Sequence, residues 1–146
     1  MAKLFTLDEA EELLPVLRAL LESAMEAQRK GEQLDGQLQR IVTRVLLLGG
    51  VQLDPLKLAA LRAERDRAMQ KLKDSLGEIE AAGVQVKDLA TGLLDFPCMR
   101  DGRIVLLCWK LGEERIEHWH GTTEGFAGRK KIDRARFPSG SPPRLN

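Results

Sequence analysis

The feature that most constrains the fold is a change in the spacing of apolar residues at Gly83. Before this glycine, leucines and alanines recur every three or four residues, which is the spacing of an amphipathic helix. After it, apolar and polar residues alternate, which is typical of strands that bury one face. The sequence therefore predicts an α+β fold in which the helices come first and a small sheet follows.

The helical part carries clear start and stop signals. Thr6 and Glu9 have the spacing of a capping box ahead of the first apolar stripe. Asp54 followed by Pro55 is typical of a second helix start, and Gly83 of its end. Because both segments are amphipathic, we expect them to pair through their apolar stripes.

These signals predict helices over about 7–48 and 54–82, packed as a long antiparallel hairpin. Pro15 predicts a kink or a restart near the beginning, because proline removes a backbone hydrogen bond. Gly31 lies farther along the same segment and weakens a helix. The sequence is compatible with one helix over residues 7–48 or with two that meet near Gly31.

The part after Gly83 predicts a three-stranded antiparallel meander within about 84–120. Strand-like runs at 92–98 and 103–110 flank Asp101-Gly102, a pair that favours a tight hairpin turn. A third short strand is expected at 115–120. Since so small a sheet is not stable alone, we expect it to pack against the helices.

The length of 146 residues fits one domain. We expect a single α+β domain over residues 1–136. The segment 137–146 is rich in proline and serine, and we expect it to be flexible.

Charge and composition exclude several classes of function. The chain has 23 basic and 22 acidic residues, so it has no overall attraction to nucleic acid, and we do not expect nucleic-acid binding. Its apolar runs are too short to span a bilayer, and no signal peptide is recognisable, so no membrane association is expected. Two cysteines do not form a disulfide framework, and we expect a cytoplasmic protein.

Side chains suited to a site are concentrated in the segment 106–121. It holds both tryptophans, both histidines and one of the two cysteines: Trp109, Trp119, His118, His120 and Cys108. The tryptophans fit either a cross-strand pair in the core or a platform for a ligand. The segment is therefore the first place to look for a functional site.

The two histidines alternate along an expected strand, so His118 and His120 would share one face. That spacing allows a divalent metal site, with further ligands from nearby carboxylates or a thiol; the candidates are Glu113, Glu114, Asp95 and Cys108. Hydrogen-bonded structural histidines are the alternative. No cofactor motif is present, so a divalent metal is the cofactor hypothesis, with His120, His118 and Glu113 as its ligands.

The cysteines are not expected to pair. Counting outward from the Asp101-Gly102 turn, Cys98 faces residues 104–106 and not Cys108. Cys108 fits either a small core residue or a thiol nucleophile with a neighbouring histidine as its base.

Several motifs together resemble the DUF2203 family of small prokaryotic proteins. The similarity extends to about Ile132 and includes FTLDEA near the start, GLLDFP, LCWKLGE, WH and GFAGR. By this resemblance, the motif residues of the family are Asp95, Trp109, Glu113, Trp119, His120 and Arg129, which we take as candidate binding residues. The family has no assigned reaction. His118 is not a motif position, which favours His120 with Glu113 and Asp95.

These observations lead to two functional hypotheses. The first is a non-enzymatic binding or adaptor module with a polar site on the meander, which forms a homodimer or binds a protein partner through its helices. The second is a metal-dependent or acid–base enzyme, similar to a hydrolase, that uses Asp95, Glu113 and His120. In either case we expect Arg129 to fold over the meander, closing either a salt-bridged latch or a ligand site.

Overall fold

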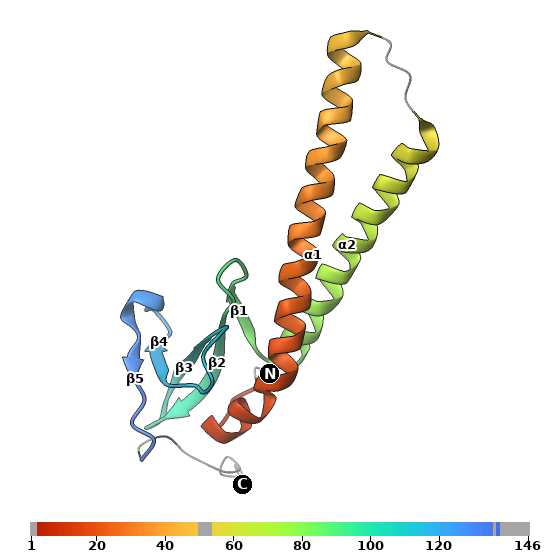
Figure 1. Ribbon diagram of the computed structural model, residues 1–146. Coiled ribbons are helices and arrows are strands. Elements are labelled where there is room, and N and C mark those ends of the chain that lie inside the picture. Colours follow the sequence, from red (N-terminus) through yellow and green to blue (C-terminus); the bar gives the residue numbers. More distant parts are fainter. Residues whose placement is uncertain (1–2, 50–53, 136, 138–146) are drawn as a thin grey trace. The chain divides into compact units, whose positions relative to one another are not determined.

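The structure is a computed structural model that describes residues 3–49, 54–135 and 137 (Figure 1). It contains two helices and an antiparallel sheet, so the fold is α+β as predicted. The chain divides into two compact units. We call Glu22–Ser75 the hairpin unit, and Met1–Leu21 with Leu76–Asn146 the sheet unit. Neither described helix is long and apolar enough to cross a membrane.

Both predicted helices are present, α1 over Leu7–Leu48 and α2 over Pro55–Ala81. The capping box is formed: the Thr6 N–H donates to Glu9 Oε1 at 3.0 Å, and the Glu9 N–H donates to Thr6 Oγ1 at 3.1 Å. Asp54 caps α2 by accepting the N–H groups of residues 56 and 57. α1 is one continuous helix that contains Pro15, so the restart and the division near Gly31 do not occur.

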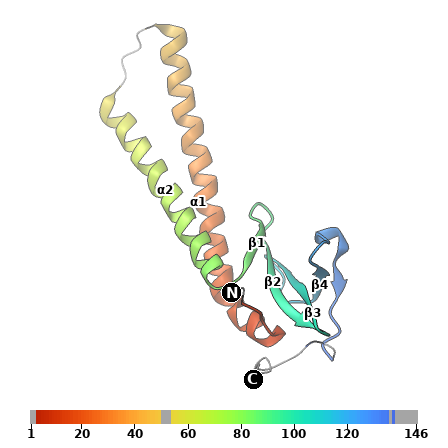
Figure 2. The ribbon, with the colours of Figure 1, turned by 180° about the vertical axis from the view of Figure 1, so that it is seen from behind.

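In the hairpin unit the two helices run antiparallel and side by side (Figures 1 and 2). Ser75 Oγ donates to Ser23 Oγ at 3.3 Å near one end, and Arg65 contacts Asp35 at 3.4 Å farther along. Between these contacts Gly31 lies against the α2 side chains of residues 68 and 69. Small residues at such positions let two helices approach closely. The two predicted helices therefore contact each other along this unit through these side chains.

The sheet has five strands in the order β1-β2-β3-β4-β5, with every neighbouring pair antiparallel. The strands are β1 Gln85–Asp88, β2 Leu93–Arg100, β3 Arg103–Lys110, β4 His118–Gly121 and β5 Lys130–Lys131. The prediction of three strands is wrong. The two strands it lacks, β1 and β5, are only four and two residues long, too short to give a reliable pattern of alternation.

The third predicted strand also begins later than expected, at His118 instead of residue 115. The reason is that the backbone of Ile116 bonds to side chains and not to a neighbouring strand. Its N–H donates to the Glu11 carboxylate at 3.2 Å, and its carbonyl accepts from Arg134 at 3.3 Å. Side chains therefore supply the hydrogen bonds of this backbone segment, in place of a neighbouring strand.

The Asp101-Gly102 turn between β2 and β3 is confirmed. Asp101 has φ 49° and Gly102 has φ 76°. Positive φ at both central residues is the requirement of a type I′ hairpin turn, which matches the twist of the flanking strands. The turn fixes the register between β2 and β3, in which Asp95 lies opposite Cys108.

One face of the sheet packs on the first part of α1 and forms the core of the sheet unit. Phe5 meets Phe96 edge to face, with ring centroids 5.5 Å apart. Leu94, Leu107 and Trp109 share this face and are fully buried. The predicted flexible segment 137–146 lies outside the described residues except for Phe137, which is buried. The opposite face carries Asp95, Cys108 and His120, which are also buried.

Candidate functional site

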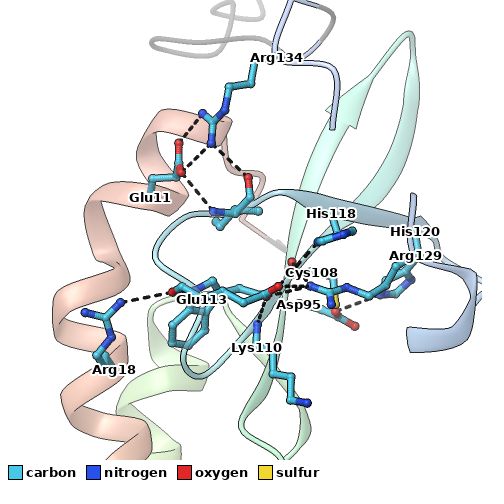
Figure 3. Close-up of polar contacts among 12 residues, drawn as sticks. Glu11, Arg18, Asp95, Cys108, Lys110, Glu113, His118, His120, Arg129 and Arg134 are labelled. Carbon is cyan, nitrogen blue, oxygen red and sulfur yellow. Dashed lines mark hydrogen bonds and ion pairs between the residues drawn. The ribbon is translucent and has the colours of Figure 1, made fainter. Parts of the chain in front are cut away.

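The opposite face of the sheet gathers most of the polar residues that the sequence singled out (Figure 3). The strand register aligns Asp95, Cys108 and His118 across three strands, and His120 lies two residues farther along β4. We call these four residues the polar face. Alternation along each strand places them together, because residues two apart point to the same side.

Asp95 and His120 form a buried pair on the polar face. His120 Nε2 lies 3.0 Å from Asp95 Oδ1, and both side chains are only 1% exposed. The other ring nitrogen, Nδ1, lies 2.8 Å from the carbonyl oxygen of Gly121. Asp95 Oδ2 has no hydrogen-bond partner among the described residues. Burial of such groups is costly unless they are paired, so this contact explains how the histidine is tolerated here.

Cys108 joins this pair. One possible ligand atom from each of Asp95, Cys108 and His120 lies within 4.8 Å of the other two. Burial raises the pKa of the Cys108 thiol to about 11, although the nearby Arg129 opposes the shift. The thiol is therefore protonated at neutral pH, which makes it a poor nucleophile. Cys98 faces Val105 as predicted, and both cysteines are free.

Glu113 and Arg129 form a second pair at the edge of the polar face. Arg129 donates to both carboxylate oxygens of Glu113, at 2.8 and 3.0 Å. The same carboxylate accepts the Lys110 N–H at 2.7 Å, and the Glu113 carbonyl accepts from Trp109 Nε1 at 2.9 Å. Glu113 thus holds the turn after β3, while Arg129 holds the segment after β4. The structure brings the predicted carboxylates, imidazole and guanidinium together as two separate pairs.

His118 contacts Glu113 more loosely than His120 contacts Asp95. Its Nδ1 lies 3.8 Å from Glu113 Oε2, and both side chains are partly exposed. The cluster of possible metal ligands among the described residues includes neither His118 nor Glu113.

The two tryptophans have different surroundings and do not pair with each other. Trp109 is fully buried in the core, whereas Trp119 lies opposite Leu107 and is partly exposed. The guanidinium of Arg100 and the ammonium of Lys130 each lie 4.6 Å from the Trp119 ring. Trp119 is therefore in contact with two cations, one from β2 and one from β5.

A third polar contact, between Glu11 and Arg134, was not found from the sequence. Arg134 donates to both carboxylate oxygens of Glu11, at 2.8 and 3.0 Å (Figure 3). Burial raises the pKa of Glu11, but the hydrogen bonds from Arg134 and the Ile116 N–H outweigh it, so the pKa lies below its usual value. No local pattern indicates this pair, because its members are 123 positions apart.

The far end of the hairpin unit presents an apolar surface. Four leucines there are the most exposed large apolar side chains of the described residues: Leu46 at 78%, Leu47 at 77%, Leu48 at 64% and Leu56 at 82%. We call these four residues, with the half-exposed Val42, the hairpin-end surface. The sequence analysis considered the run 45–48 only as too short for a membrane span.

A groove of about 440 Å³ lies between the helices beside this surface. Six apolar residues from α1 and α2 contribute to it: Leu38, Ile41, Val42, Val45, Leu46 and Leu58. Farther along, the hairpin unit buries side chains such as Ala27 and Ala68, but no residue of 39–49 or 54–67 is buried. The two helices therefore bury little of each other's apolar surface at this end.

Comparisons with known proteins identify a family but no activity. A model of a family described as an uncharacterized conserved protein, DUF2203, matches residues 3–132. No curated protein and no solved structure matches the chain.

Proposed function

We propose that this chain, which belongs to the DUF2203 family, is a non-enzymatic binding module. In this proposal the hairpin-end surface binds an acidic, amphipathic helix of a partner protein. The observation that carries the proposal is the gathering of the four most exposed leucines beside an apolar groove. An amphipathic helix that lays its apolar face in such a groove is a common mode of recognition.

The apolar area supplies the driving force. Full burial of one leucine side chain contributes about 1.5–3 kcal/mol, so the leucines Leu46, Leu47, Leu48 and Leu56 offer a sizeable gross gain. Part of that gain offsets the loss of translational and rotational freedom on association. An exposed apolar cluster of this kind is typical of an interaction site.

Charge indicates which partner fits. Between residues 36 and 63 the sequence holds four basic residues, Arg40, Arg44, Lys57 and Arg62, and one acidic residue, Asp54. Asp54 is used as the cap of α2, and the four cations have no ion pair among the described residues. Acidic residues around the apolar anchors of a partner would complement them.

The same charges argue against a second copy of this chain as the occupant. A symmetric dimer through the hairpin ends would bring two sets of four cations together, and like charges at an interface are unfavourable. The homodimer predicted from the sequence therefore becomes the main competing outcome of the test.

The polar face supports a binding module over the hydrolase-like alternative. Asp95 and His120 are 1% exposed and lie in direct contact with each other. Glu113, the third residue of that alternative, is engaged by Arg129 and the Lys110 N–H. An acid–base pair must come within hydrogen-bond reach of a substrate, and burial of this kind blocks that approach.

The proposal is tested with a fluorescent synthetic peptide of about 18 residues, with leucines at helical spacing and glutamates elsewhere. We expect saturable binding, measured by fluorescence anisotropy, that weakens at least tenfold in the double variant Leu46→Ser, Leu47→Ser. Arg44→Glu should also weaken binding. The matched control is Val16→Ser, which alters an exposed apolar residue of α1 outside the hairpin unit and should bind as the parent does.

Each competing occupant gives its own result. If sedimentation shows a dimer that is lost in the double variant Leu46→Ser, Leu47→Ser, the occupant of the surface is a second copy of this chain and not an acidic partner. Tighter binding to vesicles of anionic lipid than to the peptide would replace it by a membrane surface. Equal binding of a peptide with lysines in place of glutamates would contradict the role of charge.

A further inference from the structure

We propose that Asp95, Cys108 and His120 form a binding site for one Zn²⁺ ion on the polar face. This inference goes beyond the proposed function and concerns the other unit of the molecule. The three residues come from β2, β3 and β4, and the strand register brings them together. Their possible ligand atoms all lie within 4.8 Å of one another.

The hydrogen bonds of His120 present the correct nitrogen. A carbonyl oxygen can only accept, so His120 Nδ1 carries a hydrogen and donates it to the Gly121 carbonyl at 2.8 Å. Nε2 is then the nitrogen whose lone pair is free to bind a metal. Histidine ligands usually have this arrangement, in which the second ring nitrogen donates to a carbonyl or a carboxylate that fixes the ring.

The contact between His120 and Asp95 requires either a hydrogen or a metal ion between its two atoms. Nε2 lies 3.0 Å from Asp95 Oδ1, and an ionised carboxylate, like a bare imidazole nitrogen, only accepts. Either a proton or a metal ion satisfies both atoms. A proton leaves Asp95 Oδ2 without a partner among the described residues. A zinc ion gives that second oxygen a role as a further ligand or as the acceptor from a bound water.

The charges balance when the metal is zinc. A thiolate from Cys108 and a carboxylate from Asp95 carry two negative charges, which the ion neutralises, while His120 binds in its neutral form. All three side chains are buried, and a neutral site is the least costly one to bury. The guanidinium of Arg129 lies near Cys108, but its charge is balanced by Glu113.

The ligand types select the metal. Zinc binds thiolate, imidazole and carboxylate at about 2.0–2.3 Å, which places neighbouring ligand atoms roughly 3–4 Å apart. Small side-chain rotations bring the three atoms to that spacing. Magnesium and calcium prefer a shell made mostly of oxygen ligands, and in this set only Asp95 supplies oxygen. The site shares His120 with the set predicted from the sequence, and it takes Asp95 and Cys108 in place of His118 and Glu113.

The test uses full-length protein purified without a histidine tag and stripped of metal by a chelator. Because the ligands are buried, Zn²⁺ or Co²⁺ is added both to the folded protein and during refolding from urea. We expect one metal ion per chain by elemental analysis. With Co²⁺ we expect a thiolate-to-metal charge-transfer band in the near ultraviolet. Zn²⁺ should raise the melting temperature, and Mg²⁺ should leave it unchanged.

Matched variants locate the ligands. Cys108→Ser should abolish the cobalt band and weaken Zn²⁺ binding at least 100-fold, whereas Cys98→Ser, which alters the other buried free thiol, should retain both. His120→Gln should lose binding, and His118→Gln should keep it within threefold. If a ligand variant does not fold, the band and stoichiometry of Cys98→Ser and of the parent still decide.

Three results would overturn the proposal. The first is a parent protein that takes up no stoichiometric Zn²⁺ after either treatment. The second is a cobalt complex without a thiolate band. The third is a loss of binding in His118→Gln as large as in His120→Gln, which would move the metal to the ligand set predicted from the sequence.

Discussion

The sheet unit and the hairpin unit differ in the kind of side chain that they bury or expose. The sheet unit buries an aspartate and a histidine in contact with each other. At the far end of the hairpin unit, leucines are exposed to solvent and do not belong to a core. In the first, contacts between residues far apart in the sequence stabilise the fold; in the second, local helix formation leaves apolar surface exposed. This difference distinguishes the residues that stabilise the fold from the exposed residues that, in the proposed function, bind a partner.

The two units also show that the distance between the charged atoms of an ion pair does not determine how much the pair contributes to stability. Arg129 and Glu113 in the sheet unit are 2.8 Å apart with side chains 12% and 27% exposed. Arg29 and Glu26 in the hairpin unit are 2.7 Å apart but 73% and 65% exposed. Water competes with the second pair and screens it, so the first should contribute more to stability.

The largest difference should come from removing one leucine in each unit. Leu17→Ala removes a side chain that is 1% exposed and should lower the free energy of unfolding by about 2–5 kcal/mol. Leu46→Ala alters a side chain that is 78% exposed and should change it by less than about 0.5 kcal/mol. Urea denaturation checks both. Equal losses would mean that the hairpin end is part of the stabilising core.

The ion pairs provide the next comparison. Glu113→Gln leaves the part-buried Arg129 without its anion and should cost about 2 kcal/mol. Glu26→Gln breaks an exposed pair between neighbouring helical turns and should cost about 0.3–0.5 kcal/mol. The two costs are measured at low and high salt, and only the smaller should vanish at high salt. A cost for Glu113→Gln below that for Glu26→Gln would contradict the account.

Glycine-to-alanine substitutions should change the free energy of unfolding in opposite directions in the two units. Gly92 has φ 71°, and an added Cβ would lie 2.7 Å from Leu111 Cβ, so Gly92→Ala should destabilise by about 1–2 kcal/mol or more. Gly36 is inside α1, where an added Cβ meets only the flexible end of Arg40 at 3.6 Å. Gly36→Ala should therefore stabilise by up to about 1 kcal/mol. Thermal denaturation of both variants tests the signs.

The smallest effect concerns acid. The pKa of Glu11 in the folded state lies below its ordinary value of 4.5, so its contribution to stability is present above that value. The contribution is lost as the pH falls through the lowered pKa. Glu11→Gln should therefore show a shallower loss of stability below pH 4.5 than the parent. Glu12→Gln, at an exposed neighbouring position, should follow the parent, and a parallel curve for Glu11→Gln would refute the sign.

The sequence was sufficient for the features that depend on local patterns. The capping box of Thr6 and Glu9, the cap at Asp54 and the turn at Asp101-Gly102 each need only a few adjacent residues, and all are formed. The same local reasoning left open a restart at Pro15, which does not occur, because a long helix can omit one hydrogen bond and continue.

The features that the sequence did not reveal depend on distant partners. The bond between Glu11 and Arg134 displaces Ile116 from the sheet, and no pattern near either residue indicates it. The sequence pointed to the segment 106–121 as a candidate site, but it did not reveal that His120 pairs with Asp95 and Glu113 with Arg129. Register decides that His120 meets Asp95, and it depends on the pairing of β2 with β3 and of β3 with β4.

The central claim is that binding takes place at the hairpin end while the sheet unit remains a closed, stabilising structure. The most direct test is to map backbone amide chemical shifts while the acidic amphipathic peptide is added to the full chain. The account predicts changes confined to residues 38–49 and 54–65, with 93–131 unaffected. Changes centred on residues 93–131, with the hairpin end unaffected, would contradict it.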